Sequence, residues 1–131
     1  MPEVVSVCAR TVVDVTTVDV VRACAAELPR SYEVVVRDRL KLRVGSYVYV
    51  AFSRDETELG FAFPKEERQA LVDSRPDTFF LPRPSDLRYH WVEGWLERIG
   101  DDEVREIVLD AWQMVVPKRV AAAHLASLGL A

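Results

Sequence analysis

The chain has 131 residues, of which half are hydrophobic and 29% are charged, a balance typical of one folded domain and unlike that of a disordered segment. Its formal net charge of −4 at pH 7 excludes a protein that is basic over its whole surface, although a local basic patch on an acidic protein can still bind DNA. No apolar run reaches the ~18 residues of a membrane-spanning helix and residues 1–10 lack a signal-peptide pattern, so we expect a cytoplasmic protein without a membrane partner.

Residues 1–15 are rich in valine and contain no turn signal, so they are either an additional strand or an N-terminal extension. The first helix is predicted over residues 17–28. Thr16 and Asp19 have the spacing of a capping box, in which each side chain satisfies an end amide of the helix. Spacings of three and four residues place a set of apolar side chains on one helical face, namely Val20, Val21, Cys24, Ala25 and Leu28.

Three strand-like stretches follow, over residues 32–36, 37–44 and 47–53. Side chains alternate in the second of them, with apolar residues toward one sheet face and cations toward the other. The apolar residues are Leu40, Leu42 and Val44, and the cations are Arg37, Arg39, Lys41 and Arg43. The sequence therefore predicts a strand with one basic face.

A turn signal at Gly45 separates the second stretch from the third, and two loop lengths fit there. A two-residue loop pairs Val44 with Tyr47 and places cations beside valines, whereas a three-residue loop keeps apolar side chains together. Because register follows the hydrophobic pattern, we predict the longer loop, with Gly45 in the left-handed conformation. The pairs expected from this register are Val44–Val48, Leu42–Val50 and, on the outer face, Arg43–Tyr49.

The second half of the chain is predicted to contain three more strands and a helix, at residues 59–63, 78–81, 90–99 and 64–74. A further helix, capped by Asp101 or Asp102, has an apolar stripe that includes Trp112. Pro117 breaks or restarts this helix, and the last segment runs toward a stop at Gly129. Consecutive strands with short turns indicate an antiparallel sheet, and helices with one apolar stripe must cover one of its faces. We therefore predict the α+β class, with the other sheet face free.

Four stretches of the chain carry a family resemblance. They are Leu42-Arg43-Val44-Gly45, Pro64 with the acidic helix Lys65-Glu66-Glu67-Arg68-Gln69-Ala70-Leu71, Arg88-Tyr89-His90-Trp91-Val92, and Asp110-Ala111-Trp112-Gln113-Met114-Val115-Val116-Pro117-Lys118. In this order they resemble the MmcQ/YjbR family from about Thr16 to about His124, which makes residues 16–131 a single domain of that kind. The resemblance implies a frataxin-like (CyaY-like) architecture, an antiparallel sheet with helices packed on one face, and a DNA-binding role through a double-wing arrangement.

The chain departs from the family pattern at several positions. Tyr47 and Phe61 stand where many members have a lysine, which removes positive charge from the sheet. Ala111-Trp112 stands in place of a Ser-Tyr pair. The departures at Tyr47 and Phe61 therefore weigh against DNA binding through the sheet.

We recognise no catalytic or metal-binding constellation in the sequence. The serines lack a Gly-x-Ser-x-Gly context, no glycine-rich phosphate loop is present, and His90 and His124 have no partner at metal-ligand spacing. Cys8 and Cys24 form no Cys-x-x-Cys pair and are interpreted as small apolar residues of a reduced protein. We therefore predict a non-enzymatic domain with no metal and no cofactor.

The basic strand face is the strongest candidate for a binding site. Cations beside an aromatic ring can contact phosphates and stack bases, whereas the alternative is a solvated face whose charges prevent edge-to-edge pairing. The residues predicted to bind nucleic acid are Arg37, Arg39, Lys41, Arg43 and Tyr49, with Arg83, Arg88, Lys118 and Arg119 as flanking cations.

The tryptophans leave a second interpretation open. Trp91 and Trp95 share one side of a strand, so they are either core residues or an exposed aromatic patch that marks a partner site. We favour the core for both of them and for Trp112. The sequence thus predicts a binding domain whose partner is DNA, with protein interaction or self-association through the exposed sheet face as the alternative.

Overall fold

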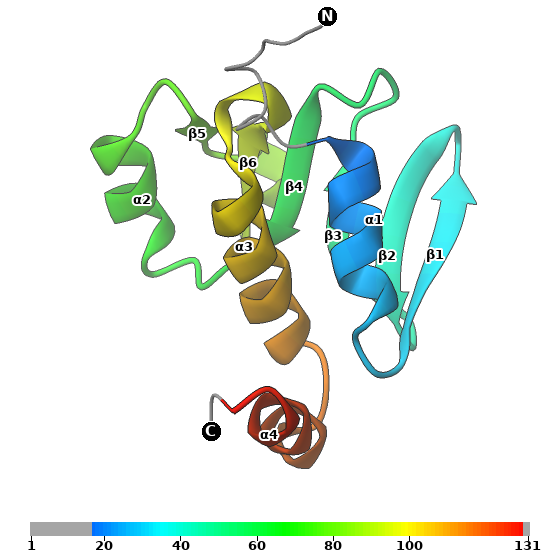
Figure 1. The fold of residues 1–131 in the computed structure, drawn as a ribbon. Coiled ribbons are helices and arrows are strands. Elements are labelled where there is room, and N and C mark those ends of the chain that lie inside the picture. The colour runs from blue at the N-terminus through cyan, green and yellow to red at the C-terminus, as the bar shows by residue number, and fades with distance from the viewer. Residues whose placement is uncertain (1–16, 130–131) are drawn as a thin grey trace, which may run out of the picture.

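In the computed structural model, which describes residues 17–129, six antiparallel strands form one sheet with four α-helices around it (Figure 1). The strands are β1 (Ser31–Val36), β2 (Arg39–Val44), β3 (Tyr47–Phe52), β4 (Glu58–Ala62), β5 (Phe79–Phe80) and β6 (Trp91–Trp95). The helices are α1 (Val18–Ala26), α2 (Arg68–Ser74), α3 (Asp101–Gln113) and α4 (Lys118–Ser127), with short 3-10 turns η2 (Pro84–Asp86) and η3 (Leu96–Arg98). The strand order is β1-β2-β3-β4-β6-β5, which confirms the predicted α+β class with an antiparallel sheet.

Helices α1 and α3 lie on the same side of the sheet (Figure 1). The apolar stripes predicted for them are buried against it, including Val21 of α1 and Val108 and Trp112 of α3. Their partners on the sheet are Leu42, Val50, Phe52, Leu59, Phe61 and Val92. No helix between residues 17 and 129 is long and apolar enough to cross a membrane.

Trp112 is the largest fully buried side chain of the core. Its indole N–H donates a hydrogen bond to the carbonyl oxygen of Pro29 at 2.9 Å, and the His124 ring meets the indole edge-on with the centroids 5.2 Å apart. The end of α3 is thereby joined both to the turn between α1 and β1 and to α4. The predicted core position of Trp112 is confirmed.

The helix boundaries differ from prediction at the N-termini of α1 and α3. Thr17 caps α1, accepting a hydrogen bond from the Val20 amide at 3.4 Å, whereas Thr16 lies outside the described residues, as do residues 1–15 with Cys8. Gly100 is the N-cap of α3, so the predicted cap at Asp101 or Asp102 is wrong. Both carboxylates lie instead in the first turn, where the helix dipole stabilises negative charge.

Two further boundaries depend on contacts that periodicity does not reveal. Helix α2 begins at Arg68 rather than at Pro64, because a turn occupies residues 65–67. Strand β6 ends at Trp95, where the chain enters η3 instead of continuing to Ile99. At the C-terminal end the predictions hold, since Pro117 is the N-cap of a new helix and Gly129, with φ of 77°, follows its last turn.

The β1–β2 connection is a two-residue turn formed by Arg37 and Asp38. Both residues have positive φ, 53° and 66°, as in the type I′ turns that match the twist of a hairpin. Strand β2 therefore begins at Arg39, and the prediction that Arg37 belongs to the basic strand face is wrong. The two-residue spacing of the cations is the same in the turn as in the strand, so the sequence pattern does not show where the turn ends.

The β2–β3 register combines features of the two loop lengths that fit the sequence. The turn has two residues, with Gly45 at φ of 60°, so Val44 pairs with Tyr47 and Arg43 with Val48. An irregularity in the register at Tyr49 then restores the expected Leu42–Val50 pair. The predicted three-residue loop is wrong, and so is the predicted Arg43–Tyr49 pair. The extra residue at the bulge allows the two-residue turn and the apolar Leu42–Val50 pair to occur in the same hairpin.

Candidate binding face on the open side of the sheet

The outer face of the sheet, which points away from α1 and α3, presents the cations of β2 and the tryptophans of β6. The strand register aligns its side chains in rows across the strands. The central row contains Val34, Lys41, Ala51, Gly60, Glu93 and Phe80 on six consecutive strands. Cations thus occupy β2, small residues occupy the centre, and acidic and aromatic residues occupy β6 and β5.

Three cations on β2 form what we call the basic row, Arg39, Lys41 and Arg43. Successive members are about 6.6 Å apart along the strand, and their neighbours on β1 are Val36, Val34 and Tyr32. Within residues 17–129, none of the three has a carboxylate oxygen within 4.0 Å. The Nε of Arg43 is buried without a hydrogen-bond partner among the same residues.

The position of β2 in the sheet removes one explanation of the basic row. Charges on an edge strand can prevent pairing with another sheet, but β2 lies between β1 and β3, and β1 and β5 are the outermost strands formed by residues 17–129. The basic row is therefore not an edge-protecting feature. It concentrates positive charge on an internal strand of a chain whose net charge is negative.

Several predicted residues do not lie on this face. Tyr49 is fully buried in the core, where its hydroxyl group shares a hydrogen bond with that of Ser31, so its assignment to the outer face is wrong. Phe61 is also buried in the core, so it does not take positive charge from the outer face. Lys118 and Arg119 lie in the first turn of α4, which is not part of the sheet.

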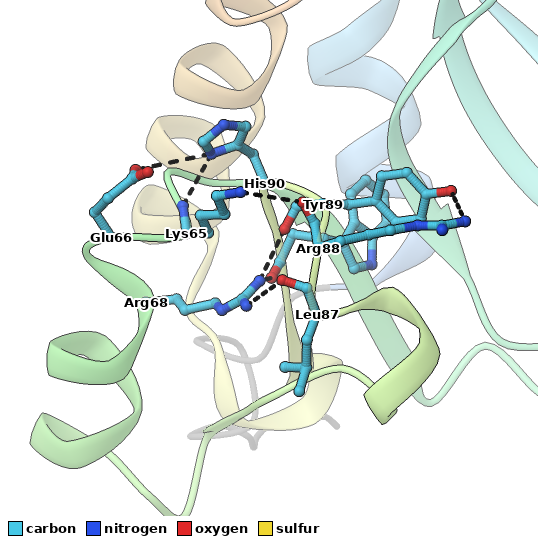
Figure 2. A network of polar contacts seen from close by, with 8 residues as sticks. Lys65, Glu66, Arg68, Leu87, Arg88, Tyr89 and His90 are labelled. Carbon is cyan, nitrogen blue, oxygen red and sulfur yellow. Dashed lines mark hydrogen bonds and ion pairs between the residues drawn. The ribbon is translucent and has the colours of Figure 1, made fainter.

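The predicted flanking residue Arg88 lies in the connection that leads into β6. Its guanidinium stacks over the Tyr89 ring at 4.8 Å and donates a hydrogen bond to the Tyr89 hydroxyl at 2.7 Å. Figure 2 shows the two side chains extending together, away from α2. Arg83 precedes the η2 turn and pairs with Asp86 at 3.0 Å, so its charge is neutralised locally.

Arg68 fixes the course of that connection from α2. Its buried guanidinium donates to the carbonyl oxygens of Tyr89 at 2.8 Å and Trp91 at 3.1 Å, and also to that of Leu87 (Figure 2). The nearby His90 accepts a hydrogen bond at Nδ1 from the Lys65 amide at 3.0 Å. The same nitrogen lies 3.9 Å from a carboxylate oxygen of Glu66 (Figure 2).

The other half of the outer face forms an aromatic–acidic patch, which we define as Phe80, Trp91, Glu93 and Trp95. Trp95 is 39% exposed and packs against Phe80 with the ring centroids 5.0 Å apart. The Trp91 ring lies over Gly60, where an added Cβ would come within 2.6 Å of it. The preferred core assignment is wrong for Trp95, which is exposed on the outer face, whereas Trp91 lies on the same face but is partly buried and packs against the core.

Glu93 is the residue of this patch that the sequence interpretation missed. Glu93 lies two residues from Trp91 and two residues from Trp95 along β6, so the three side chains point to the same face of the sheet. The strand alternation that groups the tryptophans therefore also places Glu93 with them. Burial, followed by the negative charges of Glu58 and Asp86, raises the pKa of the Glu93 carboxyl group. The outer face therefore carries a carboxylate in an environment that favours its neutral form.

We expect Glu93→Gln to stabilise the protein at pH 7.5. Folding raises the pKa of the Glu93 carboxyl group, so the ionised carboxylate destabilises the folded state at neutral pH. This cost disappears when the pH falls below the ordinary pKa of glutamate, because the carboxyl group is then protonated in both the folded and the unfolded protein. Solvent screening keeps the effect near 0.5 kcal/mol, roughly 2 °C in Tm. Thermal denaturation from pH 3.5 to 7.5, with the exposed Glu97→Gln as the control, measures it; an equal or larger gain at pH 3.5 would contradict the assignment.

Two surface grooves lie elsewhere on the domain. One groove, of about 450 Å³, lies beside the start of α1 and is lined by Asp19, Asp55, Glu56 and Glu97 as well as Arg22. Another, of about 590 Å³, lies between the α1–β1 turn and α4. Among residues 17–129 there is no cluster of three or more His, Cys, Asp or Glu side chains suited to a metal ion.

The fold and the outer face define a small α+β domain that exposes one face of a mixed-charge antiparallel sheet. The YjbR family model matches residues 26–114, and the chain belongs to this family. The fold is also similar to the crystal structure of protein DR2400 from Deinococcus radiodurans, which carries the domain DUF419, with a TM-score of 0.68, 23% identity and 94% of each chain covered. No curated protein matches the chain. The frataxin-like comparison implied by the family stays a prediction.

Proposed function

We propose that this protein is a non-enzymatic binding domain that holds single-stranded nucleic acid on its outer sheet face. The observation that carries the proposal is the basic row, three aligned cations without a carboxylate partner among residues 17–129. Cations on a sheet can contact successive phosphates, and aromatic rings beside them can stack bases. Trp95 and Phe80 supply such rings three and four strands away.

The acidic side chains of the same face favour a single strand over a duplex. Glu58 and Glu93 lie on β4 and β6, where the second phosphate backbone of a duplex would have to pass. A single strand can keep its phosphates over β2 and direct its bases toward β6. This geometry uses the mixed charge of the face, which a duplex would not tolerate.

The non-enzymatic part of the proposal rests on the surroundings of the nucleophiles and bases. His90 uses Nδ1 to accept a backbone hydrogen bond, and His124 packs against Trp112. Burial raises the pKa of the Cys24 thiol, whereas an activated cysteine has a lowered pKa. In the part of the chain that the structure describes, none of these groups is paired as a nucleophile with a base.

We expect the wild-type protein to bind a labelled single-stranded oligonucleotide with micromolar affinity at low salt, measured by fluorescence anisotropy. Three phosphate contacts to a single strand give a slope of about −2 in the plot of log K against log salt. The double variant Arg39→Glu/Arg43→Glu should lose at least about tenfold in affinity and show a shallower slope. Arg39 is exposed, whereas Arg43 is half-buried with its Nε out of contact with solvent, so the single variant Arg39→Glu, whose Tm should change little, separates a loss of binding from a loss of stability.

The matched control reverses two charges elsewhere, in Lys118→Glu/Arg119→Glu on α4. It should bind the oligonucleotide nearly as well as the wild type. Equal losses in both double variants would mean that only net charge matters, and would refute the outer face as the site. Absence of binding at low salt would refute the proposed function itself.

A second candidate function is protein interaction or self-association through the aromatic–acidic patch. The exposed Trp95–Phe80 pair favours it, since exposed aromatic patches often mark protein interfaces. In that case Trp95→Ala should change the sedimentation of the protein or abolish capture of a partner, with little dependence on salt. Nucleic-acid binding predicts the opposite salt response, so one salt series separates the two functions.

A further inference from the structure

The groove between the α1–β1 turn and α4 has the composition of a small-molecule site. It is a shallow depression that is largely open to solvent, with a volume of about 590 Å³, comparable to the roughly 300–1,000 Å³ of small-molecule sites. Pro29, Val120 and Ala123 provide apolar surface, and Arg30, Arg119 and His124 provide its nitrogen-bearing groups. No aspartate or glutamate lines it, although the chain as a whole is acidic.

Trp112 holds the two walls of this groove in place from inside the core. Its indole N–H donates to the Pro29 carbonyl oxygen on one wall, at 2.9 Å, and its ring edge contacts the His124 ring on the other. The walls come from segments about ninety residues apart in the sequence but share this fully buried anchor. A groove fixed in this way is preformed, which limits the entropy lost when a ligand binds.

Both arginines of the groove lack a partner in the part of the chain that the structure describes. No ion pair or side-chain hydrogen bond between described residues involves Arg30 or Arg119, and both residues are exposed, so their guanidinium groups are available to a ligand as those of the basic row are. Arg30 also has φ of 67°, a left-handed conformation that glycine adopts at lower cost. Strained backbone that places a charged side chain beside a groove is typical of a binding site.

We propose that this groove binds a small organic acid, with its apolar body against Pro29, Val120 and Ala123 and its carboxylate held by Arg30 and Arg119. Guanidinium groups recognise carboxylates through paired, charge-assisted hydrogen bonds, and the apolar surface beside them selects acids that carry a ring or an alkyl chain. The site lies on α4 and the α1–β1 turn, apart from the outer sheet face. It therefore goes beyond the proposed nucleic-acid function and does not depend on it.

Titration of the full chain with 2-naphthoate and with neutral 2-naphthamide, followed by calorimetry and by NMR shifts of the groove amides, tests this proposal. We expect naphthoate to bind with a submillimolar Kd and naphthamide at least about tenfold more weakly. Arg119→Gln and Arg30→Gly should each weaken naphthoate binding by about threefold to tenfold. Arg30→Gly should also fold at least as well as the wild type, because glycine suits the positive φ.

The matched control is Lys118→Gln, which removes the same charge from the same turn of α4 but from a side chain that does not line the groove. It should leave naphthoate binding unchanged. Equal binding of naphthoate and naphthamide, or a loss in Lys118→Gln as large as that in Arg119→Gln, would overturn the proposal. So would the absence of naphthoate binding, or shifts confined to amides outside the groove.

Discussion

Replacing Trp112 by alanine is expected to lower the free energy of unfolding by about 3–5 kcal/mol, the range observed when a buried aromatic side chain is truncated. The indole is fully buried, and its hydrogen bond to Pro29 joins α3 to the turn before β1. Alanine would leave both a cavity in the core and an unpaired carbonyl oxygen. Equilibrium unfolding in urea measures this loss of stability. Because domains of this size have only ~5–15 kcal/mol of stability, we expect a larger unfolded fraction of the variant at 37 °C.

Two companion variants separate the contributions at this position. Trp112→Phe retains most of the apolar volume and removes the N–H donor, so it should cost about 1–2 kcal/mol. Met114→Ala, at the exposed C-cap of the same helix, should cost roughly 0.5 kcal/mol or less. If Trp112→Ala were no more destabilising than Met114→Ala, the central position assigned to the indole would be wrong.

Replacing Arg68 by methionine is expected to cost about 3 kcal/mol of stability. Arg68 is 9% exposed, and its guanidinium donates to the carbonyl oxygens of Leu87, Tyr89 and Trp91, in the connection before β6 and at the start of that strand (Figure 2). Methionine preserves the apolar stem of the side chain but removes every hydrogen-bond donor. Hydrogen bonds from charged groups contribute about 1.5–3 kcal/mol each. Part of this loss is offset when the connection relaxes and water hydrates the freed carbonyl oxygens. Hydrogen exchange of the amides at residues 87–91 should accelerate with the loss of stability.

Lysine at this position distinguishes charge from geometry. Arg68→Lys retains the positive charge but cannot reach three carbonyl groups with a planar fork, so we expect it to recover less than half of the loss. Lys65→Met is the control, because the exposed Lys65 side chain makes one long hydrogen bond to the same connection, at 3.4 Å to the Arg88 carbonyl oxygen, and the substitution leaves the backbone hydrogen bond to His90 in place. A loss in Lys65→Met comparable to that in Arg68→Met would show that the connection is not held by Arg68.

The helical faces of this fold could be predicted because they depend on local spacing alone. The apolar residues of α1 and α3 recur every three or four positions, and their burial follows once a sheet is present to cover. The start of α2 was not predicted correctly, because Pro64 suits a first turn in general but here a separate turn precedes the helix. Capping at Gly100 likewise depends on the backbone path from η3 rather than on residue type.

Strand residues were harder to assign, since one irregularity reverses the side of every residue beyond it. Because of the bulge at Tyr49, that side chain lies in the core and not on the predicted outer face. The residue types of the Tyr47–Phe52 segment do not indicate a bulge. Arg37 was misplaced for a related reason, because a turn with two left-handed residues was not distinguished from a strand whose charges alternate. Three of the four predicted strand cations nevertheless share the outer face.

The remaining parts of the two sites depend on contacts between distant segments. Glu93 could have been found from its parity with Trp91 and Trp95, but its proximity to Glu58 and Asp86 depends on strand order and on the path of η2. Arg119, predicted as a flank of the sheet, instead lines the same groove as Arg30, which is some ninety residues earlier in the chain. The position of Arg119 in this groove follows from how α4 packs against Trp112, and residue spacing along the sequence does not reveal that packing.

Mapping a bound single-stranded oligonucleotide by backbone amide shifts tests the central claim most directly, because it locates the binding face on the unmodified protein. We expect the largest shift changes on the outer face, at Arg39–Val44 of β2, the facing residues of β3, and Trp91–Trp95 of β6, and we expect them to diminish as salt is raised. Changes concentrated on α1, α3 or α4 with β2 unaffected would contradict it.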